Sequence, residues 1–200
     1  MNSIDKLSEL FARFPGIGPR QAKRFVYFLL SRDSGYLSEI VKNIENLKND
    51  ISQCQSCQRY FPLGLSQGNL CRICLDNTRD KSILMIVPRD IDLESIEKSG
   101  IFYGSYFVLG GVIPILDKEP EKQVRLALLD KRLKSDSNIK EVVLAMNVNN
   151  DGQHTSDYIR EKFKDLKLVF TVLGRGLSTG AELEYSDPET IKNAFIHRTK

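Results

Sequence analysis

All four cysteines of the chain lie in one short stretch, as two Cys-x-x-Cys pairs separated by thirteen residues. They are Cys54, Cys57, Cys71 and Cys74. Two such pairs at this separation can place four thiolates around one tetrahedral metal ion, and Zn²⁺ is the usual occupant. Four thiolates leave no open coordination position, so we expect the ion to stabilise the loop and to take no part in catalysis.

Other arrangements of the cysteines are less compatible with the sequence. Two disulfides are disfavoured, because the N-terminus MNSIDKLSEL lacks the apolar segment of a secretory signal and a cytosolic compartment keeps thiols reduced. A thioredoxin-like redox centre needs one pair beside a βαβ pattern. The symmetric spacing argues against four unrelated buried cysteines. The doubled pair therefore favours a structural zinc site.

A second chemical signal is the stretch FPGIGPRQAKRF, in which Gly16 and Gly18 join two amphipathic segments. This pattern is typical of a helix-hairpin-helix, whose glycines let backbone N–H groups approach a phosphate. Arg20, Lys23 and Arg24 follow and add positive charge. Contacts of this kind reach phosphates and not bases, so DNA binding should be independent of sequence and sensitive to salt. The alternative is an αα-hairpin whose glycines only make a tight turn.

Positive charge is concentrated in the same region. Residues 1–32 hold six basic and two acidic residues, a local net charge of +4, whereas the whole chain carries +3. A polyanion would be expected to bind this positively charged N-terminal region. No apolar run approaches the ~18 residues of a membrane span.

Three helices are expected before the cysteines. Ser3 can cap the first, which would end at Pro15 and present one apolar face: Ile4, Leu7, Leu10, Phe11 and Phe14. The second begins at Pro19. The third covers residues 37–51 with an apolar side and a solvated Lys/Glu/Asn side.

The spacing of apolar residues along the chain changes after Asp76. Short apolar runs at 83–87, 106–109, 142–146 and 168–173 alternate with amphipathic stretches at 93–98, 121–133 and 155–163. Apolar strands that alternate with helices predict a mostly parallel sheet covered on both faces, with function collected at the carboxyl ends of the strands.

Carboxylates near two of these strand ends allow a rival, enzymatic interpretation. Mg²⁺-dependent phosphoryl transfer needs a cluster of carboxylates on hard cations. Asp90, Asp92 and Glu94 follow the first strand, and Asp151 follows a later one among asparagines. The preferred interpretation of the first three is acidic residues at a helix N-terminus. Weak Mg²⁺ binding by Asp90 and Asp151 stays open, and so does an interaction module without DNA contact.

The tail is rich in glycine from Gly174 to Gly180 and contains no GxxxxGK[ST] phosphate loop. Asp187 and Pro188 predict the cap and first turn of a last helix. Arg175, Ser178 and Thr179 could line a site, but we prefer to interpret them as part of a glycine-rich loop that packs on a second subunit. We interpret His154 as exposed or capping, and His197 as a cation in the last helical turn.

The ordered set of motifs closely resembles the bacterial RecR family of recombination mediators. These motifs are FPGIGPRQAKRF, the four-cysteine loop followed by Asp76 and Arg79-Asp80, YFVLGGVIPILD and GLSTGAELEYSD. The resemblance covers essentially the whole chain. It implies a helix-hairpin-helix at 1–53, a four-cysteine zinc finger at 54–76, a Toprim domain at 77–173, and a Walker B-like C-terminal segment with an oligomerisation helix at 174–200.

The same resemblance implies a non-catalytic role in recombinational DNA repair. Such proteins act with RecO, and also RecF, to help RecA load onto single-stranded DNA. They form dimers and tetrameric rings in the cytoplasm, at the nucleoid. The resemblance places Gly16, Gly18, Arg20, Lys23 and Arg24 at the DNA, and the cysteines on zinc. It makes the Asp90–Leu173 region the expected surface for RecO. Pro88 and Gln153 depart from acidic residues that are common in the family.

Overall fold

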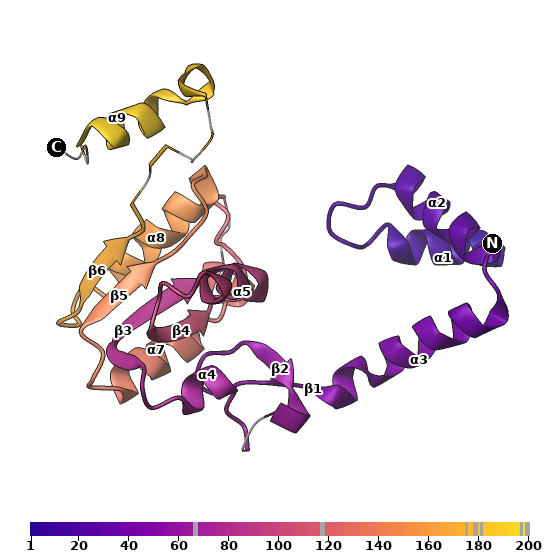
Figure 1. The fold of residues 1–200 in the computed structure, drawn as a ribbon, viewed down its shortest axis with the longest axis horizontal. Helices are drawn as coiled ribbons and strands as arrows, with labels where there is room; N and C mark the ends of the chain where they lie inside the picture. The colour runs from indigo at the N-terminus through magenta and orange to yellow at the C-terminus, as the bar shows by residue number, and fades with distance from the viewer. Residues whose placement is uncertain are drawn as a thin grey trace. The chain divides into compact units, whose positions relative to one another are not determined.

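The computed structural model describes residues 1–65, 68–116, 119–174, 176–177, 180, 182–196 and 198. The chain divides into two compact units, unit 1 (Met1–Ser52) and unit 2 (Gln53–Lys200). Figure 1 shows that unit 1 is helical and that unit 2 contains the sheet. The predicted fold class, a helix-hairpin-helix and a cysteine loop joined to a mostly parallel α/β domain, is confirmed.

Unit 1 is built from α1 (Ser3–Phe11), α2 (Pro19–Leu30) and α3 (Ser34–Asp50). The rings of Phe11 and Phe25 meet edge to face at 6.0 Å and join α1 to α2. Two details of the predicted first helix are wrong. Asn2 caps α1 by accepting the Asp5 N–H, so Ser3 is already helical. The helix ends at Phe11, which leaves Phe14 exposed in the turn.

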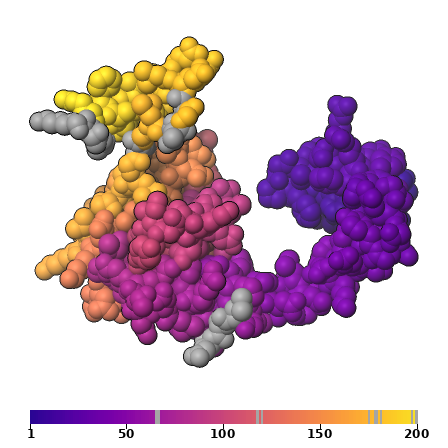
Figure 2. Space-filling view, in the orientation of Figure 1, coloured from indigo at the N-terminus to yellow at the C-terminus, as the bar shows by residue number. Residues whose placement is uncertain are grey.

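The third helix starts earlier than residue 37, because the Asp33 side chain accepts the Tyr36 N–H at 2.9 Å and caps it at Ser34. Its apolar side is exposed at Val41, Ile44 and Leu47. Figure 2 shows α3 as a narrow column of side chains that extends away from α1 and α2.

Within the described part of unit 2, four parallel strands form one sheet in the order β4-β3-β5-β6. They are β3 (Asp80–Val87), β4 (Gly104–Val108), β5 (Glu141–Leu144) and β6 (Val169–Val172). Each strand falls on one of the predicted apolar runs. A continuous apolar run marks a strand buried on both faces, as the apolar parts of β3, β4 and β5 are, whereas the edge strand β6 is partly exposed.

The two faces of the sheet are covered differently. Alternate residues, among them Ile86 and Phe107, pack against α7 (Leu126–Ser135) and α8 (Asn150–Lys162). The residues between them, including Val87 and Tyr106, pack against α5 (Asp90–Ser99) and against residues 51–75, which contain the four cysteines and are called the cysteine loop below. The cysteine loop therefore replaces a second helix on that face.

The cysteine loop contains short elements that the sequence analysis missed: β1 (Ile51–Gln53), which crosses the boundary of the units, β2 (Tyr60–Pro62), a 3₁₀ turn (Leu63–Leu65) and α4 (Arg72–Leu75). The single helix predicted over residues 121–133 is also wrong. It divides into α6 (Pro120–Gln123) and α7, because Val124 is extended and the Arg125 N–H donates to the Leu109 carbonyl at 2.8 Å.

The chain closes with a 3₁₀ turn (Leu183–Tyr185) and α9 (Pro188–Ile196). The predicted cap is confirmed, since Asp187 accepts the Thr190 N–H at 3.0 Å and the Thr190 hydroxyl at 2.7 Å. Arg175, Ser178, Thr179 and His197 lie outside the described residues.

Candidate metal centre and DNA interface

The four cysteine sulfurs converge on one point. All four Sγ atoms lie within 4.8 Å of one another, with Cys54–Cys74 at 3.7 Å and Cys57–Cys71 at 3.6 Å. These separations are too long for a disulfide, whose S–S bond is about 2.05 Å. Four sulfurs at a Zn–S length of about 2.3 Å in a tetrahedron would stand about 3.8 Å apart, so the residues present fit this ion.

The loop backbone holds the sulfurs in place. Gln58 adopts φ +63°, in the left-handed region, which lets its N–H return to the Cys54 carbonyl at 2.9 Å. The Cys71 N–H points at the Cys54 sulfur at 3.4 Å. Hydrogen bonds from Cys57, Cys71 and Cys74 lower the pKa of the Cys54 thiol. The backbone and the sulfur contacts together hold the four thiols around one point.

Three long-range hydrogen bonds fasten the cysteine loop to the carboxyl edge of the sheet. The Val108 N–H donates to the Cys57 carbonyl at 2.8 Å. Arg125 Nη1 donates to the carbonyls of both Gln58 and Val108 at 3.0 Å. The Tyr60 N–H donates to Asp90 Oδ1 at 2.7 Å. A change in the loop is therefore transmitted to β4, α5 and α7.

The glycine turn of unit 1 has the geometry of an open helix end. Gly16 has φ +76°, and a Cβ at Gly16 or Gly18 would meet no atom within 4 Å. Gly18 is the N-cap of α2 and supplies no side chain to cap its N–H groups, and the first turn contains no acidic residue. These N–H groups stay available to an anion.

Three cations stand beside this helix end. Arg20, Lys23 and Arg24 are exposed, and their spacing of three and four residues places them on one side of α2. No carboxylate in the described chain pairs with them; Arg24 contacts only the Gln21 amide, at 3.4 Å. An exposed, unneutralised row of this kind suits a phosphate backbone.

The acidic residues at the sheet edge have structural contacts. Asp90 accepts the Tyr60 N–H, and Asp151 accepts the Ile115 N–H at 3.4 Å from the first turn of α8. Asp92 and Arg89 form a capping box at the start of α5. Among the described residues, the four cysteines are the only group of three or more His, Cys, Asp or Glu side chains placed to share an ion.

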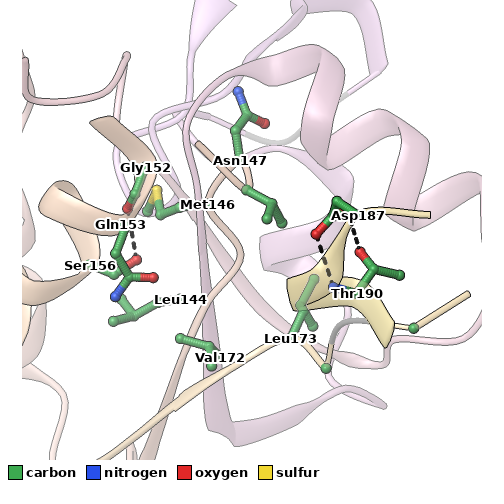
Figure 3. Close-up of a pocket in the computed structure, with 13 residues that line it drawn as sticks. Leu144, Met146, Asn147, Gly152, Gln153, Ser156, Val172, Leu173, Asp187 and Thr190 are labelled. Carbon is green, nitrogen blue, oxygen red and sulfur yellow. Dashed lines mark hydrogen bonds between the residues drawn. The ribbon is translucent and has the colours of Figure 1, made fainter. Parts of the chain in front are cut away.

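A pocket of about 520 Å³ lies at the carboxyl ends of β5 and β6, the edge of the sheet at which the sequence analysis expected function. Figure 3 shows Gln153 and Ser156 of α8 on one wall, with Leu173, Asp187 and Thr190 on the opposite side. Its described lining contains no basic side chain, and the Asp187 carboxylate is engaged by Thr190.

Comparison with known proteins places the chain in a family. A family model described as "RecR, helix-hairpin-helix" matches residues 4–48, one for the Toprim domain matches 82–174, and one described as "RecR, C-terminal" matches 176–199. The recombination protein RecR of Staphylococcus saprophyticus is 34% identical over 197 residues, covering 98% of this chain and 96% of that protein. The chain belongs to the RecR family. RecR from Limosilactobacillus reuteri is 33% identical over 198 residues, with the same coverage.

The RecR matches coincide with the features described above. The helix-hairpin-helix match contains the glycine turn and its row of cations, and the Toprim match contains the parallel sheet. The pocket lies where the Toprim and RecR C-terminal matches meet. None of the described helices combines the length and the apolar character that a membrane-spanning segment needs.

Proposed function

We propose that this chain is a non-catalytic, DNA-binding mediator of recombinational DNA repair. The observation that supports this role most directly is the uncapped start of α2 beside Arg20, Lys23 and Arg24. In this role it works in the cytoplasm at the nucleoid. It acts with RecO and RecF to promote the loading of RecA onto single-stranded DNA, as the family membership suggests.

DNA is held through its phosphates in this proposal. Gly16 and Gly18 let the backbone N–H groups reach one phosphate, and the three cations neutralise its neighbours. None of these contacts reads a base edge, so single and double strands of any sequence are substrates for binding.

The cysteine loop is a structural zinc finger in this proposal, with Cys54, Cys57, Cys71 and Cys74 as the ligands. The sulfur separations and the closed ligand set support Zn²⁺. A bound ion supplies cross-linking of the loop and no chemistry. The boundaries proposed for the parts are 1–53, 54–76, 77–173 and 174–200.

RecO is proposed to dock on the Asp90–Leu173 region, with Asp90 and Asp151 at the sheet edge of that surface. Dimers and tetrameric rings are proposed to form through the N-terminal helices and the C-terminal segment. The exposed apolar residues of α3, including Ile44 and Leu47, support the contact through the N-terminal helices, since burying these side chains between subunits would be favourable.

The Toprim match favours one alternative, Mg²⁺-dependent phosphoryl transfer at the sheet edge. That chemistry needs several free carboxylates around the ion. The engagement of Asp90 with Tyr60 counts against it. Mg²⁺-dependent cleavage of DNA that is abolished by Asp151→Ala would establish this alternative.

The helix-hairpin-helix role is tested by reversing two of its charges. We expect Lys23→Glu with Arg24→Glu to weaken binding to a duplex about tenfold or more at ~0.1 M salt, and to reduce the slope of log K against log salt by about two. Fluorescence anisotropy of a labelled duplex measures both quantities. Lys42→Glu with Lys48→Glu is the matched control, because it makes the same charge change on α3. Unchanged affinity in the α2 variant would remove this helix from the DNA site.

A further inference from the structure

Besides the three cations of α2, two arginines line one hollow on the cysteine loop. Arg59 precedes β2 and Arg72 is the first residue of α4, yet both line the same pocket of about 230 Å³ with Phe61, Pro62 and Cys71. Two arginines thirteen positions apart in the sequence thus line one hollow.

These two arginines differ from most others in unit 2. Arg79, Arg89, Arg132 and Arg160 each form an ion pair with a carboxylate. No such pair exists for Arg59 or Arg72 within the described residues, and the only hydrogen bond found for either side chain runs from Arg59 Nε to the Tyr60 carbonyl at 3.4 Å.

The surrounding sequence supplies no neutralising charge either. From Cys54 to Leu75 the chain contains no aspartate or glutamate. A guanidinium has five donors in a planar fork that matches phosphate oxygens, and an unneutralised pair around one hollow suits an anion.

We propose that Arg59 and Arg72 form a second phosphate-binding site, which holds the sugar-phosphate backbone of DNA against the cysteine loop. The proposal rests on the DNA-binding function and extends it from α2 to a loop otherwise assigned only a structural role.

The competing role for the two arginines is charge balance. A Zn²⁺ ion with four thiolates has a formal charge of −2, and Cys71 belongs to the pocket wall. Arginines that only balance this charge would affect retention of the metal and leave the salt dependence of DNA binding unchanged. The two roles therefore give different measurements.

The test uses the full chain with Arg59→Gln and Arg72→Gln together. We expect affinity for labelled oligo(dT) and for a duplex to fall about three- to tenfold at ~0.1 M salt, with the salt slope reduced by about one to two. Metal content, measured with a chromogenic chelator, should stay at one ion per chain. Lys134→Gln with Arg160→Gln is the matched control, because it removes two positive charges elsewhere on unit 2. Affinity and slope equal to those of the unaltered protein overturn the proposal.

A second measurement needs no variant. Phenylglyoxal modifies accessible arginines, and peptide mass spectrometry reports each site. Bound oligo(dT) should protect Arg59 and Arg72, and full modification of both in the complex overturns the proposal even if the variant loses its metal. A loss of binding in the α2 charge reversal with no effect at the loop would leave the helix-hairpin-helix role intact. Unchanged affinity in both variants would exclude both α2 and the loop from the DNA site.

Discussion

Gly152, in the first turn of α8, has no room for any side chain. A Cβ atom there would lie 2.1 Å from the carbonyl oxygen of Asn147. Its N–H donates to the Asn149 side chain at 2.8 Å, which fixes the turn between β5 and α8. The close approach shapes the sheet edge that holds Asp151.

We expect Gly152→Ala to lower the free energy of unfolding by about 2 kcal/mol, or about 6 °C in Tm, because the turn must open to admit the methyl group. Thermal denaturation followed by circular dichroism measures the change. Gly174→Ala provides the control, since a Cβ at this position would meet nothing within 4 Å. Equal melting temperatures for the two variants would contradict the close approach.

At this scale the sequence identifies chemical groups better than their contacts. The cysteines and the cations of α2 were found from residue type and spacing alone. Asp90 was predicted as an acid at a helix start, with weak Mg²⁺ binding left open. Its bond to the Tyr60 N–H joins positions thirty residues apart. No local pattern signals such a contact, because it depends on how the loop folds over the sheet.

Arg125 shows how one side chain joins three elements. Its Nη1 donates to Gln58 in the cysteine loop and to Val108 at the end of β4, while its own N–H interrupts the helix between α6 and α7. The periodicity of residues 121–133 predicted one continuous helix. The interruption follows from a tertiary contact with Leu109, which amphipathic spacing does not encode.

We expect Arg125→Met to lower the free energy of unfolding of unit 2 by about 2 kcal/mol, because the methionine keeps the packing but cannot donate to the two carbonyls. Chemical denaturation in urea measures the loss. Arg160→Met should change stability by less than about 0.5 kcal/mol, since its ion pair with Asp157 is exposed. A loss no larger than in this control would contradict the joining role of Arg125.

The features on which the proposed function depends are distributed over the two compact units. Unit 1 contains the glycine turn, and unit 2 contains the sheet, all four cysteines and the Arg59–Arg72 pocket. Strand runs and helical periodicity were enough to predict both kinds of structure. The small elements of the cysteine loop could not be predicted, because a short loop of mostly polar residues follows no hydrophobic period.

We expect metal removal to affect unit 2 alone. After chelation, hydrogen exchange should rise in the cysteine loop, at the end of β4 and at the start of α7, because the bonds from Val108 and Arg125 lose their partners. Exchange in α1 and α2 should stay the same. Mass spectrometry of peptic peptides measures both regions, and equal exchange with and without chelator would exclude a structural role for the ion.

The parallel register of the sheet sets an order of events while the chain is being synthesised. The central strand β3 pairs with β4 and β5, so it must wait for partners made well after it. The outermost cysteines are only twenty positions apart, so the loop that they close needs no strand made later in the chain. The loop can thus be folded first and offer the Cys57 carbonyl as a ready template for the end of β4.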